Sequence, residues 1–125
     1  MDNGDISLIS FNYDKIVNYG DKMPYGGNDN PAYGFVWKTV ERLGLGAAKN
    51  PLQSIIKPGN AVLIKPNLIG HIPGTYTRPA VIMPIIDMAV AAGAGKIYIA
   101  DAGINFFETE HTLASTCYSE MARCL

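Results

Sequence analysis

Two short apolar runs constrain the fold of this chain more than any other feature of its sequence. AVLIK at 61–65 and KIYIA at 96–100 are continuous apolar stretches of strand length, with no alternation of polar and apolar residues. Such runs are typical of strands in a parallel sheet whose two faces are both covered by helices. ISLISF at 6–11 is a shorter candidate for a first strand.

Helical patterns separate these runs. Asn30 and Pro31 predict a helix start, with Asn30 as N-cap and Pro31 at the first helical position. Gly44 predicts the end of that helix. The apolar residues between them recur every three or four positions: Tyr33, Val36, Trp37, Val40 and Leu43. After a helical turn at 50–56, Pro58 and Gly59 predict a type II turn.

The segment TRPAVIMPIIDMAVAAG at 77–93 predicts a second helix. Thr77 is its expected N-cap, and Gly93 is its expected end. Pro84 lies inside this helix, and its missing N–H leaves the carbonyl of Ala80 without the usual helical partner. The last segment, 108–125, has the pattern of one continuous helix.

The order of elements is therefore strand, helix, strand, helix, strand, helix. Because crossovers between parallel strands are almost always right-handed, this order predicts an α/β fold, a three-layer Rossmann-like sandwich with a small, mainly parallel sheet. Residues 1–125 are expected to form a single domain, with a flexible Gly/Tyr-rich loop or flap at 12–33. Three strands make a small sheet, so we expect either the front part of a longer protein or pairing with another subunit in a homo-oligomer.

Charge and composition exclude several classes of partner. The chain has 10 basic and 11 acidic residues and no basic block, which argues against binding to nucleic acid. It has no apolar run long enough to span a membrane and no leader-like start, so a cytoplasmic protein is the expectation.

Ligands of open parallel sheets bind beyond the carboxyl ends of the strands. Lys65 and Asn67 follow one predicted strand, Asp101 follows the next, and Thr77 and Arg78 open the helix between them. Two cations beside a helix N-terminus would suit a carboxylate or a phosphate. The alternative is that Asp101 is only the internal counter-ion of Lys65, and the sequence leaves both interpretations open.

Other chemistry has weaker support. Neither G-x-G-x-x-G nor a Walker-type phosphate loop is present, and no cofactor is identifiable. His71 and His111 have no metal-ligand spacing around them. We therefore interpret them as surface residues and predict no metal site, since such a site would need the two to converge in the tertiary structure.

Three segments resemble a known family: IIKPGNAVLIKPNLIG, TRPAVIMPIIDMAVAAGAGKIYIADAG and TLASTCYSEMA. Together they look like the N-terminal half of proteins in the domain of unknown function family 362, over about residues 52–122. Many members of that family carry a cysteine-rich, ferredoxin-like segment further along the chain. This chain has no such segment, so an iron–sulfur cluster cannot be carried over onto it from the resemblance.

A more distant similarity is to the N-terminal domain of the nickel-pincer lactate racemase family, in which a Thr-Arg-Pro also opens a helix. That likeness implies that Thr77 and Arg78 contact a phosphate or a substrate carboxylate. The predicted function is binding of a small anionic ligand by Lys65, Asn67, Thr77, Arg78 and Asp101. Two alternatives stay open. One is part of an isomerase- or redox-type enzyme whose cofactor or iron–sulfur segment is missing from this chain, and the other is a non-catalytic assembly domain.

Overall fold

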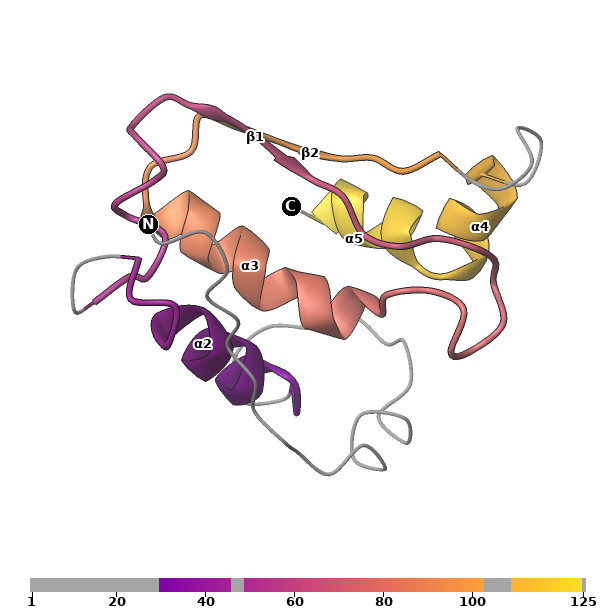
Figure 1. Cartoon of the computed structure of the whole chain (residues 1–125). Coiled ribbons are helices and arrows are strands. Elements are labelled where there is room, and N and C mark those ends of the chain that lie inside the picture. The colour runs from indigo at the N-terminus through magenta and orange to yellow at the C-terminus, as the bar shows by residue number, and fades with distance from the viewer. Residues whose placement is uncertain (1–29, 46–48, 103–108, 125) are drawn as a thin grey trace.

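A small parallel sheet forms one side of the structure, a computed structural model that describes residues 30–45, 49–102 and 109–124 (Figure 1). Strand β1 (Ala61–Ile64) pairs with β2 (Lys96–Ile99) in register from the first residue to the last. Both strands coincide with the continuous apolar runs, so these two predicted strands and the α/β class are confirmed.

The described helices lie on one side of this sheet. Helix α3 (Pro79–Ala91) runs beneath the strands, and α2 (Tyr33–Glu41) lies on the far side of α3 (Figure 1). Helix α5 (Tyr118–Cys124) lies beneath the carboxyl ends of the strands, and α4 (Thr109–Ser115) lies further out, beyond these ends (Figure 1). The opposite face of the two strands exposes large apolar side chains in the described part of the structure, since Leu63 is 65% exposed and Tyr98 is 47% exposed.

Two groups of buried residues hold these elements together. The first fills the space between the sheet, α3 and α5, and its members include Ile64, Leu68, Ile86, Tyr118 and Met121. The second joins α3 to α2 and to the turn at 50–56, through Val40, Leu52, Ile56, Met88 and Ala89. Helix α3 contributes to both groups, so it is the central element of the described fold.

The ends of α3 show which sequence signals were right. Pro79 is at the first helical position and Gly93 has a φ of +93°, as expected for a helix that ends in a left-handed glycine. The prediction that Thr77 caps this helix is wrong. Arg78 occupies the N-cap position, no side chain caps it, and the Thr77 hydroxyl bonds elsewhere.

Pro84 leaves the Ala80 carbonyl without a helical donor, and the structure supplies one from another segment. The side-chain amide of Asn30 donates to Ala80 O at 2.7 Å, while its Oδ1 accepts the N–H of Ala32. Asn30 is therefore not the N-cap of α2, which begins at Tyr33 with Ala32 at the cap position. Instead, it fixes the segment before α2 to α3.

A second Asn-Pro pair repeats this arrangement at 50–51. The Asn50 amide donates to Met88 O at 2.8 Å, and its Oδ1 accepts the N–H of Leu52 at 3.0 Å. Asparagine side chains of this kind close local turns with one atom and remain able to bond elsewhere with the other. Both turns thus attach to the backbone of the same helix.

The last helical segment is broken, so the prediction of one continuous helix over 108–125 is wrong. Cys117 lies between α4 and α5 with a φ of +64°, an uncommon conformation for a residue with a Cβ. The break follows from tertiary packing, because it allows Tyr118 to be buried while its hydroxyl donates to Thr77 O at 2.8 Å. Helical periodicity carries no information about that distant partner.

Two predictions lie outside the described residues: the strand at 6–11, and the loop or flap at 12–33 except for its last four positions. In the described part, no helix has the length and apolar character needed to cross a membrane. The type II turn is supported, since Gly59 has a φ of +83° and Asn60 N–H donates to Lys57 O at 3.0 Å.

Candidate functional site

The candidate site lies where β1 and β2 both end. Lys65 follows the last residue of β1 directly, and Asp101 comes two positions after β2. The backbone extends the pairing between the strands, since Ala100 N–H donates to Ile64 O at 3.1 Å. Parallel strands with matched ends thus bring Lys65 and Asp101 together, as their sequence positions predicted.

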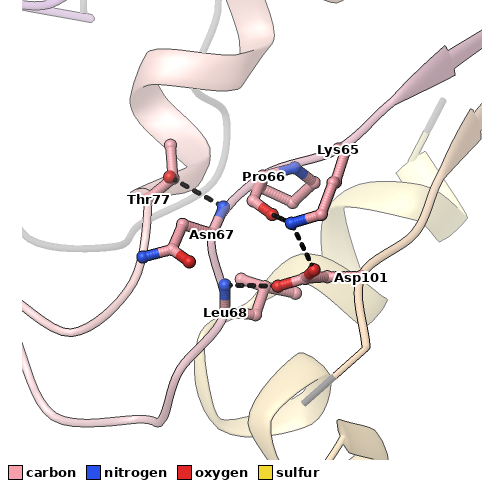
Figure 2. Close-up of polar contacts among 6 residues, drawn as sticks. All are labelled: Lys65, Pro66, Asn67, Leu68, Thr77 and Asp101. Carbon is pink, nitrogen blue, oxygen red and sulfur yellow. Dashed lines mark hydrogen bonds and ion pairs between the residues drawn. The ribbon is translucent and has the colours of Figure 1, made fainter. Parts of the chain in front are cut away.

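Lys65 and Asp101 form an ion pair (Figure 2). Lys65 Nζ lies 2.6 Å from Asp101 Oδ1, and the two side chains are 65% and 5% exposed, respectively. The carboxylate is therefore inside the protein, while the lysine reaches it from the solvent side. The Lys65 ammonium carries three N–H donors. Besides Asp101 Oδ1, its second acceptor is Pro66 O, at 3.5 Å from Nζ.

Asp101 also holds the loop that follows β1. Its Oδ2 accepts the backbone N–H of Leu68 at 2.7 Å, and Leu68 itself is 1% exposed (Figure 2). The hydrogen bond from Lys65 lowers the pKa of Asp101, burial acts in the opposite direction, and the bond from Leu68 lowers it further. A backbone bond from Ala102 lowers the pKa of Asp101 as well, so the carboxyl is ionised at neutral pH. Its charge-assisted bonds with Lys65 and with the Leu68 N–H join the two ends of a short stretch of chain.

Asn67 and Thr77 form a second pair, which closes the loop between them. Thr77 Oγ1 accepts the N–H of Asn67 at 3.1 Å, and Thr77 N–H donates to Asn67 O at 2.8 Å. Figure 2 shows the Asn67 side chain pointing away from Lys65, on the side of the loop where Thr77 lies. The Asn67 amide and the Lys65 ammonium therefore point to opposite sides of this loop.

Arg78 follows Thr77 at the start of α3, partly buried and in an extended conformation, with φ −69° and ψ 142°. The five predicted residues thus fall into an ion pair, Lys65 with Asp101, and a loop-closing pair, Asn67 with Thr77, next to Arg78.

Sequence reasoning missed two contributors, the Leu68 N–H and the Tyr118 hydroxyl. No sequence signal could have found either, because every residue has an N–H and Tyr118 matched an ordinary apolar helix face.

One known protein family matches the part of the chain that contains the candidate residues. The family described as Domain of unknown function (DUF362) matches residues 62–125, which is half of the chain. This chain belongs to the DUF362 family. The DUF362 match contains all five candidate residues. It also contains every described element from β1 onward, apart from Ala61, the first residue of β1. Helix α2 and the two Asn-Pro turns precede the matched region.

Other comparisons add no relative of known activity to the DUF362 assignment. Neither a curated protein nor a solved structure matches the chain at a significant level. The more distant resemblance to the nickel-pincer lactate racemase family therefore stays a prediction.

Proposed function

We propose that this DUF362 domain binds a small anionic ligand, a carboxylate or a phosphate, beside Lys65 at the carboxyl ends of β1 and β2. The observation that carries the proposal is the exposure of Lys65: its side chain is 65% exposed although its ion-pair partner is buried. The buried carboxylate fixes the direction of the ammonium, and the solvent side stays accessible to a ligand. Strand ends of this kind are the usual ligand position in parallel sheets.

The charges predict weak binding. Asp101 neutralises Lys65, so a ligand gains about 1.5–3 kcal/mol from one hydrogen bond to the ammonium. The N-terminus of α3 beside Arg78 would contribute about 0.3–1 kcal/mol more. The sum of about 2–4 kcal/mol corresponds to a dissociation constant of about 1 mM or weaker.

Each candidate residue has a separate role in this proposal. Lys65 contacts the anion, and Asp101 directs Lys65 while holding the loop through Leu68. Thr77 fixes the loop by its bonds with Asn67, whose amide remains to orient a ligand on the α3 side together with Arg78. Because the Asn67 amide and the Lys65 ammonium point to opposite sides of the loop, a small anion would contact Lys65 alone, and only a longer ligand that extends across the loop would also reach Asn67 and Arg78.

The test is titration of phosphate and of acetate, at constant ionic strength, into the full chain, followed by NMR chemical shifts of backbone amides. Lys65→Met should abolish the shifts near the loop. Lys57→Met is the matched control, because Lys57 is also exposed but lies in the turn before β1. Asp101→Asn should bind at least about fivefold more tightly, since Lys65 then lacks its counter-ion. Equal responses from wild type and Lys65→Met would contradict the proposal.

A second candidate is an assembly domain, and the apolar face that the sheet exposes in the described part of the structure favours it. Leu63 and Tyr98 are exposed there and lie opposite each other in the register of β1 and β2. Continuous apolar strands of this type are typical of sheets covered on both faces. We extend the proposal to a three-layer Rossmann-like sandwich, in which a further layer covers Leu63 and Tyr98. Leu63→Ser would then change the oligomeric state or the stability, measured by light scattering and by urea unfolding, while leaving the anion titration unchanged.

A further inference from the structure

The fold brings together two histidines that are 40 positions apart in the sequence. The ring centroids of His71 and His111 lie 5.2 Å apart, with the ring planes at 85°. His71 belongs to the loop after β1, and His111 belongs to α4. They are the two histidines of the chain, so this is the tertiary convergence that their sequence spacing did not show.

The loop that carries His71 is closed by its own hydrogen bonds. Ile69 N–H donates to Thr75 O at 3.1 Å, and Thr75 N–H donates to Ile72 O at 3.0 Å. The Thr75 hydroxyl donates to the same Ile72 carbonyl at 2.7 Å. His71 lies inside this closed stretch, so its backbone position is held before any ligand arrives.

The two rings line one cavity of about 300 Å³ at the surface. Its lining consists of Ile69, Gly70, His71, Ile72, Thr75 and His111. The hydroxyl proton of Thr75 is already used within the loop, and the remaining side chains of the lining are apolar. The two imidazoles are therefore the main polar side-chain groups that this cavity offers to a ligand.

The separation of the rings suits a shared metal ion. With metal–nitrogen bonds of about 2.0 Å and tetrahedral geometry, two ligating imidazoles have their centroids about 5 Å apart. His111 also has a partner that can orient it, because Ser115 Oγ lies 3.3 Å from His111 Nε2. In the tautomer with the proton on Nε2, His111 donates to Ser115 and presents the lone pair of Nδ1.

We propose that His71 and His111 form an exchangeable site for a divalent transition-metal ion of the Zn²⁺ type, which neutral imidazole binds well. Within 30–45, 49–102 and 109–124, no three His, Cys, Asp or Glu side chains lie close enough to hold a metal. The described ligands are thus two imidazoles, and water occupies the remaining positions. Two imidazoles are about half the protein ligands of a structural zinc site. The dissociation constant for Zn²⁺ should therefore be on the order of 1–100 µM. Lys65 does not line this cavity, and the proposal does not depend on anion binding at Lys65.

The test is calorimetric titration of Zn²⁺ into the full chain, prepared without a histidine tag. Wild type should bind one ion in the micromolar range, and His71→Ala and His111→Ala should each weaken binding at least tenfold. Ser115→Ala should weaken it less, because it removes an orienting contact and leaves both ligands in place. Cys117→Ser and Glu110→Gln are controls that should bind as wild type does.

A second measurement uses wild type alone, so it does not depend on whether the variants fold. Paramagnetic Co²⁺ should broaden the NMR signals of both imidazoles at the same ion concentration. Absence of saturable Zn²⁺ binding up to 1 mM would mean that the rings only pack edge to face, and would overturn the proposal. Equal Zn²⁺ affinity in wild type and the histidine variants, or broadening of one ring alone, would overturn it too.

Discussion

Replacing Asp101 removes its contacts with Lys65, with the N–H of Leu68 and with the backbone N–H of Ala102, and these contacts differ in their contributions to stability. Oδ2 accepts the Leu68 N–H at 2.7 Å, and hydrogen bonds to charged groups contribute about 1.5–3 kcal/mol. Oδ1 pairs with Lys65, whose side chain is 65% exposed, so solvent reduces that contribution to about 0–1 kcal/mol. We therefore expect Asp101→Ala to lower the free energy of unfolding by about 2–4 kcal/mol.

Two further variants separate these contacts. Asp101→Asn keeps an oxygen for the Leu68 N–H but loses the charge, so its cost should be about 1–2 kcal/mol. Lys65→Met removes the ion pair and the long contact of Lys65 Nζ with Pro66 O, and it should cost about 0–1 kcal/mol. Urea unfolding followed by circular dichroism at pH 7 measures all three free energies. If Asp101→Ala and Lys65→Met cost the same, the Leu68 bond contributes nothing and the reasoning is refuted.

The same carboxylate should make stability depend on pH. Lys65 lowers the pKa of Asp101 in the folded protein, and a carboxyl shifted in this direction adds stability above its unfolded value of about 3.9. That contribution is lost as the pH falls through the lower, folded value. The difference in unfolding free energy between wild type and Asp101→Asn should therefore be constant from about pH 5 to 7 and shrink below about pH 4. A difference that grows on acidification would contradict this sign.

Two other predictions concern the backbone contacts that hold the fold. Asn30→Ala should cost about 1–3 kcal/mol, because it leaves a buried carbonyl of α3 without its side-chain donor. In a Pro84→Ala background the cost of Asn30→Ala should fall by about 1 kcal/mol or more, because residue 84 then donates a helical N–H to the Ala80 carbonyl. Equal costs in the two backgrounds would show that Asn30 does not replace the donor that Pro84 lacks. Gly95→Ala should cost about 1–3 kcal/mol, because a Cβ there would lie 2.9 Å from the backbone oxygen of Gly59. Gly34→Ala is its control, an exposed position of α2 with nothing within 4 Å of the new Cβ, and should stabilise by up to about 1 kcal/mol in the same urea assay.

The part of the candidate site that lies at the ends of the parallel strands was predictable from the sequence. Lys65 and Asp101 each follow an apolar run, and matched parallel strands bring such residues together. The role of Thr77 was not predictable, because a hydroxyl before a helix is a frequent cap and its actual partner, Asn67, is ten residues away. The pairing of His71 with His111 was hidden for the same reason, since it depends on where α4 packs against the loop.

The sequence by itself determined the main elements: strands at two apolar runs, a helix between them that ends before Gly93, and the α/β class. These features depend on local periodicity, fixed φ angles and missing donors, which act over a few residues. Only the tertiary structure decided that Asn30 supplies the donor that Pro84 lacks and that the last helix breaks at Cys117. Both depend on burial and hydrogen bonding between segments distant in the sequence, and no local pattern records such contacts.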